Sequence, residues 1–548
     1  MQGCALVLAG SAAALSFWPT IAPGSPQAAG PPSECASCIQ RAPAVSGFTG
    51  PSLLVTDRGD SSTAFVLHLF DVTGFGSVPP GLWNPPRYEH PSWTQVNLGS
   101  VFGVTSDEAG HVYLAHGSFM LGATAGTVGG GSGAVIRIST ATGSPTLLAT
   151  LPQSSFATGP GLGNIAWSCS TQSLFVSNFE DGRIYRIDPA LPPALRVRSA
   201  WDFATDVLSS GGAPEAGDAP GVVPPGERVW AVAPAGGRLF FSVWSRDAAH
   251  PSDPPNSIWS VDLDADGDPV PGTKALEVLL DGPGFLPSPV SDLAFTADCE
   301  LFAVQRPMFD LVTGAHFGEL MKFRWDPMIG GGSWQREGAF EVGALGGVAF
   351  GKSTAGGVAV DPSPDGLVWA TGDFLLLAPP TYGVQGLPQS GGGLANSLMI
   401  DADGDSGSIG DGDKLQQGSV SFAKGTVPGC EIELERVECV LGPNGLPTGQ
   451  FAITLSVINN SGKAVTSLLL RTLGQVVSLN PPLPSGSSTS VTVVVSGNGG
   501  DLISLLVGFY GGGAHCCSAS ITVELPICEC MLIRDVEVEC IDDGNPNT

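Results

Sequence analysis

The sequence predicts an all-β protein with two kinds of unit, and three observations support this prediction. Gly and Pro are frequent, at 76 and 46 of 548 residues, while charged residues make up only 14%. Short runs of Val, Ile, Leu and Phe recur between these turn-forming residues, whereas the periodic pattern of long helices is scarce. The spacing of the runs changes near Cys430, which divides the chain into an N-terminal repeat region and a C-terminal region of a different kind.

Residues 1–30 are predicted to be a signal peptide and a linker. An apolar stretch of signal-peptide length is followed by small residues, although no basic residue precedes Arg41. Ser, Pro and Gly interrupt this stretch before it reaches the about 20 apolar residues that a membrane span needs, and we find no span later in the chain. The prediction is a secreted or cell-surface protein, extracellular or periplasmic.

Residues 31–425 contain a repeated group of strands. An apolar strand recurs with separations of 59, 62, 65, 62 and 66 residues, starting at Leu53, Val112, Leu174, Leu239, Leu301 and Leu367. One apolar strand precedes each copy, another follows it, and weaker fourth strands fit at several copies. Such units bury their surfaces by packing face to face around an axis. This predicts a six-bladed β-propeller closed by residues 417–423, or seven blades if 31–50 or 408–425 complete another unit.

Two stretches carry a family resemblance. GGVAVDPSPDGLVWATGD and SLFVSNFEDGRIYRID resemble NHL-type propeller repeats and the related gluconolactonase/streptogramin-lyase group. The resemblance covers residues 45–425 and implies the propeller architecture. It leaves function open, because this fold hosts enzymes, binding proteins and scaffolds.

Residues 426–528 are predicted to form an immunoglobulin-like β-sandwich. Alternating apolar strands follow one another at sandwich spacing between residues 450 and 525. The region resembles bacterial immunoglobulin-like or fibronectin-type-III-like modules, which space or display other domains. CEIELERVEC at 430–439 recurs as CMLIRDVEVEC at 530–540, so we expect residues 529–548 to begin a second, truncated repeat of a longer array.

The net charge of −28, from 51 acidic and 23 basic residues, excludes a cationic surface of the kind that nucleic acids require. It suits a soluble extracellular protein or one that collects divalent cations, and a solubilising acidic surface is the simpler interpretation. The partner expected is an unidentified protein or carbohydrate ligand.

Twelve cysteines, several of them clustered, predict disulfides. Zinc is the alternative, but no second CxxC and no His pair lies at finger-like distance. Cys169 and Cys299 occupy similar blade turns and are expected either to be buried free thiols or to pair with Cys35 and Cys38. The residues predicted to form disulfides are Cys35, Cys38, Cys430, Cys439, Cys516, Cys517, Cys528, Cys530 and Cys540.

Two acidic loops are candidate calcium sites. Both follow the third strand of a unit and alternate Asp with other residues around a Gly, like the opening half of a calcium loop, although Thr273 stands where the first loop should supply a bidentate Glu. The alternative is a solvated acidic turn. Calcium is the only cofactor predicted, and its candidate ligands are Asp262, Asp264, Asp266, Asp268, Asp401, Asp403 and Asp405.

Three further polar residues are candidates for a site in the propeller channel. Asn164, Glu227 and Asp292 lie near the point where first strands enter the channel, and the family resemblance implies a Glu, an Asn and an Asp around a divalent metal there. Glu227 departs from the family pattern, because it is one residue too close to Trp230 and belongs to the fourth unit rather than the first. The alternative is that these are ordinary polar residues of a wet channel.

The leading functional hypothesis is a secreted or surface-displayed, non-enzymatic propeller protein that binds a ligand or partner, with the sandwich modules as a stalk. One alternative is an extracellular metal-dependent propeller enzyme of lactonase or lyase type. A second alternative is a structural component of an extracellular matrix or surface layer. The sequence contains no nucleophile elbow, HExxH or P-loop motif.

Overall fold

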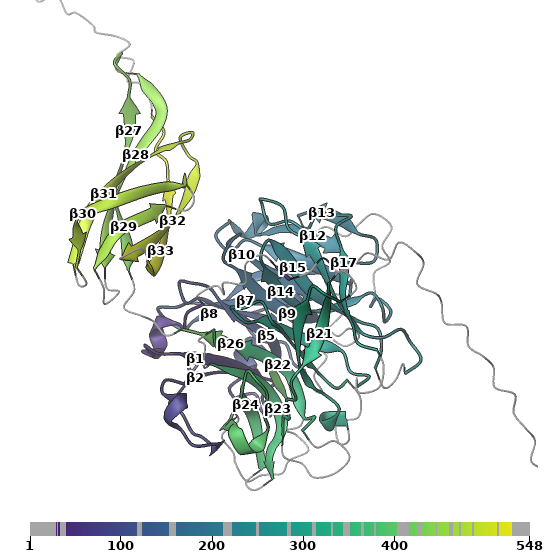
Figure 1. The fold of residues 1–548 in the computed structure, drawn as a ribbon. Helices are drawn as coiled ribbons and strands as arrows, with labels where there is room; N and C mark the ends of the chain where they lie inside the picture. The colour runs from purple at the N-terminus through teal and green to yellow at the C-terminus, as the bar shows by residue number, and fades with distance from the viewer. Residues whose placement is uncertain are drawn as a thin grey trace, which may run out of the picture.

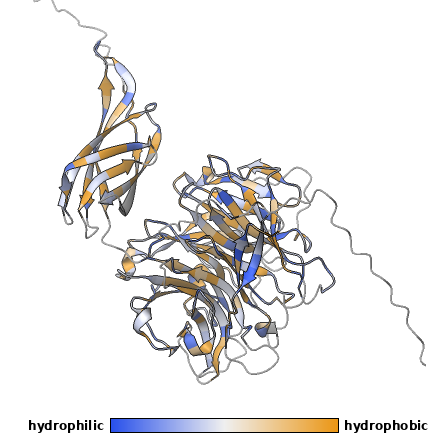
Figure 2. Cartoon of the chain, viewed as in Figure 1, coloured by the Kyte–Doolittle hydropathy of each residue, from blue (hydrophilic) through white to orange (hydrophobic). Residues whose placement is uncertain are grey.

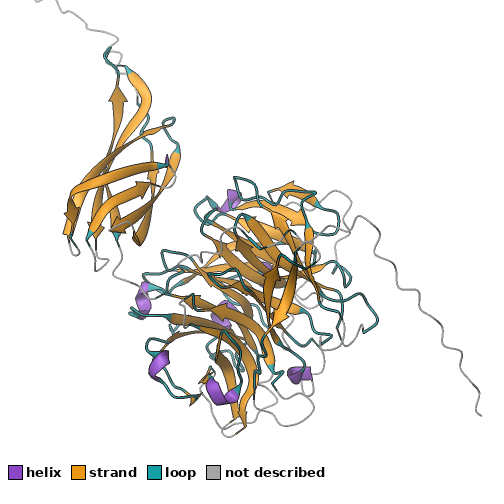
Figure 3. Ribbon diagram, in the orientation of Figure 1, coloured by secondary structure: helices purple, strands orange, loops and turns teal. Residues whose placement is uncertain are grey.

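The computed structural model is built almost entirely of β-strands, which form a propeller and a sandwich (Figure 1, Figure 3). The structure describes residues 29, 31, 32 and 40–528, except for 118–122, 153–160, 212–221, 248–250, 282–285, 309–313, 330–331, 344–350, 363–365, 378–379, 403–415, 425–429, 445, 460–463, 471–472, 485–486 and 512–513. Most of the predicted signal peptide and the predicted second sandwich repeat at 529–548 lie outside these residues.

Six sheets of four or five strands make up the propeller in the described part of the chain. The first three, each given from the inner strand outward, are β26 (Gln417–Ala423), β1 (Ser52–Asp57), β2 (Leu67–Asp71) and β4 (Arg87–Tyr88); β5 (Val101–Ser106), β6 (Val112–His116), β7 (Ala134–Ile138) and β8 (Pro145–Thr150); and β9 (Leu162–Ser168), β10 (Ser173–Asn178), β11 (Arg183–Ile187), β12 (Val197–Asp202) and β13 (Val207–Ser210).

The other three sheets follow in chain order. They are β14 (Arg228–Ala235), β15 (Arg238–Trp244), β16 (Ser257–Asp262) and β17 (Ala275–Leu279); β18 (Val290–Phe295), β19 (Leu301–Gln305), β20 (Leu320–Asp326) and β21 (Ser333–Glu337); and β22 (Thr354–Val360), β23 (Leu367–Leu377), β24 (Pro380–Pro388), β25 (Leu398–Asp401) and the parallel β3 (Gly81–Leu82). Each sheet is one blade, so the predicted β-propeller is confirmed.

Helices are few and short in the described residues. The α-helix is α1 (Gln95–Leu98), and the 3-10 turns are η1 (Ala44–Ser46), η2 (Phe75–Ser77), η3 (Gly131–Gly133), η4 (Pro193–Leu195), η5 (Gly314–His316) and η6 (Leu394–Asn396). Among these residues, no helix has the length and apolar character needed to cross a membrane.

The ring closes through strands from both ends of the propeller sequence. β26 pairs antiparallel with β1, with Ser52 opposite Ala423, and so completes the first blade as the sequence predicted. The inner strands β26, β5, β9, β14, β18 and β22 contact one another in this order, and β22 contacts β26 again. Closure in this way gives the first blade an inner strand like that of the other five, so β1 is paired on both sides.

The hydrophobic core of the propeller lies between the blades. Within the described residues, six clusters of buried apolar side chains each combine two neighbouring blades. Between the sixth and first blades, for example, Trp369 packs with Leu53 and Phe70. Both faces of the middle strands are therefore covered, which explains why these strands are apolar along most of their length (Figure 2).

The turn between β10 and β11 shows how the repeated hairpins are fixed. Gly182 has a φ of 70°, and a side chain there would collide with the carbonyl oxygen of Glu227. The Asp181 carboxylate accepts hydrogen bonds from the backbone N–H of Arg183 at 3.0 Å and from the Tyr185 hydroxyl at 2.5 Å. Burial raises the pKa of Asp181 to about 6 despite these bonds. The Asp-Gly turn is a folding feature rather than a reactive site.

Residues 430–528 form two sheets that share one core. The first sheet contains β27 (Glu431–Leu441), β28 (Pro447–Asn459) and β31 (Ser487–Ser496), and the second contains β30 (Gln475–Leu483), β29 (Val465–Leu470), β32 (Leu502–Gly511) and β33 (Ala514–Glu524). Apolar side chains from both sheets pack together, so the predicted two-sheet architecture is present. Its immunoglobulin-like character stays a prediction.

Candidate functional site

The six inner strands reach the channel in the same register. All six pairings between an inner strand and its neighbour contain a register shift near the start of the inner strand. Alignment on this shift gives layers of equivalent residues down the channel. The first layer is Phe102, Gly163, Trp230, Ser291, Gly356 and Gly418; the second is Gly103, Asn164, Ala231, Asp292, Gly357 and Ser419; the third is Val104, Ile165, Val232, Leu293, Val358 and Val420.

Side-chain hydroxyls next to the register shift join each of several blades to the next. The Ser242 hydroxyl donates to the carbonyl oxygen of Val290 at 2.7 Å and accepts from the backbone N–H of Ala231 at 2.9 Å. Equivalent bonds cross four other blade boundaries, from Thr56 to Phe102, Ser177 to Trp230, Ser291 to Gly356 and Thr371 to Gly418. These bonds hold the backbone around the channel in a fixed position.

Aromatic side chains fill the end of the channel where the inner strands begin. Phe102 and Trp230 project from the first layer, with ring centroids 5.7 Å apart, and Phe179 packs edge-on against Trp230 at 4.5 Å. Together with Trp244 these rings form one buried cluster. Because three of the six residues of this layer are glycines, there is room for two large rings.

A buried arginine stacks on this aromatic cluster. The Arg306 guanidinium lies 5.4 Å from the Phe102 ring centroid and donates to the carbonyl oxygen of Gln417 at 2.7 Å. Burial lowers the pKa of Arg306 to about 10, and the carboxylates of Asp373 and Asp57 oppose this effect. The contacts tie the fifth blade to the first two and belong to the closed end of the channel.

The other end of the channel holds a cavity of about 540 Å³. Its wall is the third layer of branched apolar residues, followed by a layer of mostly small residues: Thr105, Ala166, Ala233, Ala294, Ala359 and Ser421. The rim includes Trp167, Phe295 and Phe422, together with the polar residues Gln40 and Lys424. Asp292 and Ser419 of the second layer form the floor.

Asp292 is a buried carboxylate whose oxygens are occupied by protein donors. It accepts from the backbone N–H groups of Leu293 at 2.9 Å and Val358 at 3.0 Å and from the Ser419 hydroxyl at 2.7 Å, and the Asn164 side chain, which donates to the carbonyl oxygen of Ser291 at 3.2 Å, also interacts with it. The three hydrogen bonds use most of the about four lone-pair directions of a carboxylate. Burial raises the pKa of Asp292 to about 7, although the hydrogen bonds lower it.

The structure brings together two of the three predicted channel residues. Asn164 and Asp292 occupy the same layer and interact. Glu227 precedes β14 by one residue, and Ala231 takes the equivalent position in that blade. Four residues of strand separate Glu227 from the layer, or roughly 13 Å, so Glu227 does not complete a three-residue site with the other two.

The first acidic loop is used to join two blades. Asp268 accepts from Arg186 at 2.9 Å and from the Ser199 hydroxyl at 2.5 Å, both in the preceding blade. Asp262 pairs with Arg238 at 3.0 Å, and Asp264 accepts backbone N–H groups within the loop. Asp266 supplies one of those N–H groups. In this loop two of the four predicted calcium ligands already neutralise arginines.

The second acidic loop is only partly described. Asp401 ends β25 and is buried, while Asp403 and Asp405 lie outside the described residues. Across the part of the chain that the structure describes, no three His, Cys, Asp or Glu side chains are grouped so that they could hold a metal ion. Calcium binding therefore stays a prediction for both loops.

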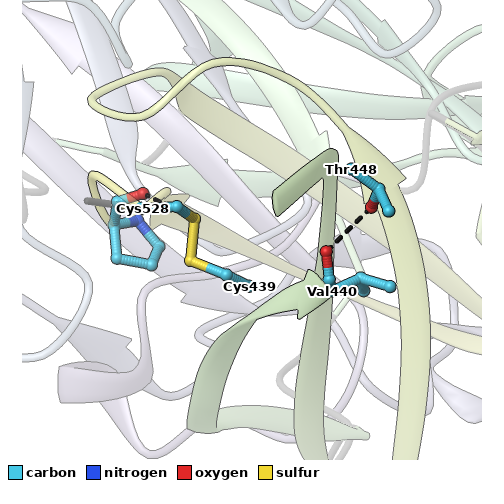
Figure 4. The surroundings of a disulfide bond; sticks show 5 residues. Cys439, Val440, Thr448 and Cys528 are labelled. Atoms are coloured by element: carbon cyan, nitrogen blue, oxygen red, sulfur yellow. Dashed lines mark hydrogen bonds between the residues drawn. A yellow bond between two sulfur atoms is a disulfide. The ribbon is translucent and has the colours of Figure 1, made fainter. Parts of the chain in front are cut away.

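Disulfides are found in both parts of the chain. Cys439 at the end of β27 is bonded to Cys528 after β33, which fastens the first strand of the sandwich to its last segment (Figure 4). Cys169, Cys299 and Cys430 are also disulfide-bonded, so the free-thiol alternative for Cys169 and Cys299 is wrong. The side chains of Cys516 and Cys517, and the whole of Cys35, Cys38, Cys530 and Cys540, lie outside the described residues.

The chain resembles known proteins in structure rather than in sequence. No protein-family model and no curated protein sequence matches the chain. Similar solved structures include a chain of a nidogen/laminin complex (12% identity, TM-score 0.35, 68% of this chain and 98% of that chain covered), a gluconolactonase from Xanthomonas campestris (14%, 0.28, 65% and 83%) and an aldose sugar dehydrogenase from Streptomyces coelicolor in its PQQ-bound form (16%, 0.31, 60% and 95%).

The neighbours include β-propeller proteins of the NHL-repeat and YWTD types. With TM-scores below 0.5 they carry no argument about this chain's activity, and the propeller assignment rests on the sheet order described above.

Sequence reasoning missed the residues that decide which end of the channel is open. Phe102, Trp230 and Lys424 were not among the predicted site residues, and the cavity lies at the end opposite to the one expected for channel ligands. A signal was present in the sequence, because alignment of the six inner strands places two aromatic residues among glycines in a single layer.

Proposed function

We propose that the chain is a secreted or cell-surface, non-enzymatic binding protein that takes a small ligand into the channel cavity, with the sandwich as a stalk. The observation that carries this proposal is the cavity itself, a volume of about 540 Å³ with an apolar wall and a polar rim. Ligand sites in proteins are concave, mostly apolar pockets of about 300–1,000 Å³ with a few placed polar groups.

The hydrogen bonds around Asp292 at the cavity floor support the binding of a small ligand rather than of a catalytic metal ion. Among the described residues, Asp292 is the only carboxylate that lines the cavity, and it accepts three hydrogen bonds from the protein and interacts with Asn164. A metal ion there would have to displace the backbone N–H of Val358 or the Ser419 hydroxyl, and would leave that donor buried and unsatisfied.

One observation favours the alternative, a metal-dependent lactonase or lyase. Asn164 and Asp292, two residues that such an enzyme would use, interact within one layer of the channel. Three of the other positions in that layer are Gly103, Ala231 and Gly357, which have no side-chain oxygen to offer a metal.

The disulfides and the acidic net charge support the proposed extracellular location. Five described cysteines are disulfide-bonded, and disulfides persist in oxidising compartments. The acidic net charge of −28 keeps such a protein soluble and fits an extracellular setting.

The test is to block the cavity and ask whether ligand binding is lost. Ala233→Trp adds a large ring at the cavity wall, where Ala233 also belongs to the core between the fourth and fifth blades, and Ala190→Trp adds the same ring at an exposed turn as a control. The ligand-free Tm of Ala233→Trp is measured first, so that a loss of binding is read only from folded protein. A library of small organic compounds is screened by thermal shift with each variant. We expect compounds that raise the Tm of the wild type and of Ala190→Trp but not of Ala233→Trp.

Two results would contradict the proposal. Hits that stabilise Ala233→Trp as much as the wild type would place the binding site elsewhere. Hydrolysis of lactones that requires an added divalent cation, and that is lost in Asp292→Asn, would favour the enzyme.

A further inference from the structure

Among the described residues, three ionisable residues line the channel cavity, and they differ in the partners of their charges. Arg238 pairs with Asp262 at 3.0 Å and with Glu277 at 3.0 Å, so its charge is already neutralised. Asp292 lies at the floor and is occupied by protein donors. Lys424 is exposed at the rim, and no carboxylate among the described residues pairs with it. Lys424 is therefore the one cavity charge available to a ligand in the described structure.

The backbone around Lys424 holds this side chain at the rim. Its N–H donates to the carbonyl oxygen of Gln40 at 2.8 Å, and its own carbonyl oxygen accepts from the N–H of Ala42 at 3.0 Å. The Gln40 side chain in turn donates to the Thr105 hydroxyl at 3.1 Å and accepts from the Ser421 hydroxyl at 2.7 Å. The start of the propeller sequence and the end of β26 thus form one fixed segment of the rim.

Glu108, an acidic residue that contacts Trp167 of the rim, is directed into other contacts. Glu108 accepts from the indole N–H of Trp167 at 2.8 Å and from the Gln172 amide at 3.2 Å, and it does not line the cavity. Burial raises the pKa of Glu108, because the ionised carboxylate is less stable in this buried position than in water. Nothing in the described cavity wall offers Lys424 a competing anion.

Between the rim and the floor the wall is apolar. The third layer contributes six Val, Ile or Leu side chains, and the next layer contributes four Ala residues with Thr105 and Ser421. An anionic group would be repelled from the floor by Asp292 whenever that carboxyl is ionised, and it would lose its hydration beside the apolar wall. A ligand with an anionic head is therefore oriented with the head at the rim and an apolar body inside.

We propose that the cavity binds an amphipathic anion, a carboxylate attached to an apolar body, with its carboxylate at Lys424 and the body against the third layer. This inference rests on the proposed binding function, and it adds the ligand class and the orientation. The long-range electrostatic field of the protein opposes the binding of an anion, because the chain's net charge of −28 attracts cations. Selection of an anion would thus have to come from the local contact with Lys424.

Three probes share one apolar chain and differ in the head group, so they test the apolar contact and the anion contact separately. Octanoate, octan-1-ol and octylamine are titrated into the full chain by isothermal calorimetry, with the wild type, Lys424→Gln, Lys424→Arg and Ala233→Trp. We expect the wild type to bind octanoate most tightly and octylamine least. Lys424→Gln should weaken octanoate about fivefold and leave octan-1-ol unchanged, because an exposed charge contact is worth up to about a factor of five. Lys424→Arg should keep the preference for octanoate.

The outcomes distinguish the two levels of the inference. If octan-1-ol and octanoate bind equally, and Ala233→Trp weakens both, then the cavity binds ligands but the anion assignment is wrong. If octylamine binds most tightly, the anion assignment is also wrong. If none of the three probes binds to the wild type while compounds of other classes bind and are blocked by Ala233→Trp, the ligand class is wrong and the binding function stands. If nothing binds in the cavity at all, the proposed function fails.

Discussion

The two ends of the channel are lined by different kinds of side chain. At the end where the inner strands begin, Phe102, Trp230 and Phe179 fill the space by aromatic packing. At the other end the same strands carry Val, Ala and Ser, and a cavity remains whose rim includes the disulfide-bonded Cys169. The comparison shows that six similar inner strands can form a channel that is closed at one end and open at the other. Two side chains of the first layer, Phe102 and Trp230, account for the closed end.

The largest effect is expected at the closed end. Trp230→Ala removes a fully buried ring from the centre of the aromatic cluster and should lower the free energy of unfolding by about 3–5 kcal/mol. Phe422→Ala at the cavity rim is the matched comparison, because its ring is only partly buried and should cost clearly less. Urea unfolding of both variants measures the difference, and equal losses would mean that the two ends are packed alike.

The disulfides at the open end give the next largest effect. Cys299→Ser removes one of these disulfides and should lower the free energy of unfolding by about 2–4 kcal/mol, since a disulfide restricts the unfolded chain. The Sγ atom of Cys299 lies 3.5 Å from the carbonyl oxygen of Pro32, so we expect the partners of Cys169 and Cys299 to be Cys35 and Cys38. Peptide mapping without reduction checks this pairing, and it is contradicted if Cys35 is found linked to Cys38.

A smaller effect is expected from Asp292, which lies between the two ends. Its pKa of about 7 in the folded state exceeds the value of about 3.9 in an unfolded chain, so the folded state holds a proton that the unfolded state has lost. Stability is therefore greatest below about pH 4, falls as the pH rises towards 7, and is constant above that value as far as this group is concerned.

Asp181, with a pKa of about 6 in the folded state, also lowers the stability as the pH rises, over a narrower pH range.

The test uses Asp292→Asn. Unfolding free energies measured at pH 5 and pH 7.5 should differ less in this variant than in the wild type. The same variant at pH 7.5 should also lose stability, because the new amide N–H₂ faces donors from Val358 and Ser419. An unchanged slope would mean that Asp292 is ionised throughout this range.

The smallest effect concerns the hydroxyls that connect the blades. Ser242→Ala removes one bond to the next blade and leaves the carbonyl of Val290 and the N–H of Ala231 without that partner, at a cost of about 1–2 kcal/mol. Because Ser242 lies beside the register shift near the closed end and does not line the cavity, binding in the cavity should be unchanged. A loss of binding without a loss of stability would show that the Ser242 hydroxyl positions the cavity wall.

The sequence was a good guide to the blades and a poor guide to the site. Each blade is specified by local signals, such as the Asp181-Gly182 turn between two apolar strands, and local signals can be recognised without knowing the fold. The fate of Asp268 could not be recognised in this way, because its partner Arg186 lies 82 residues earlier in the chain. The acidic loop resembles a calcium loop in sequence while the fold uses it to bind the neighbouring blade.

The channel residues show the same limit. Asn164 and Asp292 were predicted as channel residues, and the structure places them at the same position of two inner strands, where they interact. The saturation of Asp292 by Val358 and Ser419 depends on two other blades, and the register shift that aligns them becomes visible only when all six strands are paired. The charge at Lys424 stood out only once the partners of Arg238 were known.

The pairing of β26 with β1 also governs how the chain is made. Ser52 emerges from the ribosome 371 residues before its partner Ala423, which is roughly 20–70 s at ordinary rates of synthesis. Throughout that interval the inner edge of the first blade is an unpaired strand able to join another chain. The propeller therefore completes itself in a single late step, and the newly made protein depends on whatever keeps its first blade apart from other copies until that step arrives.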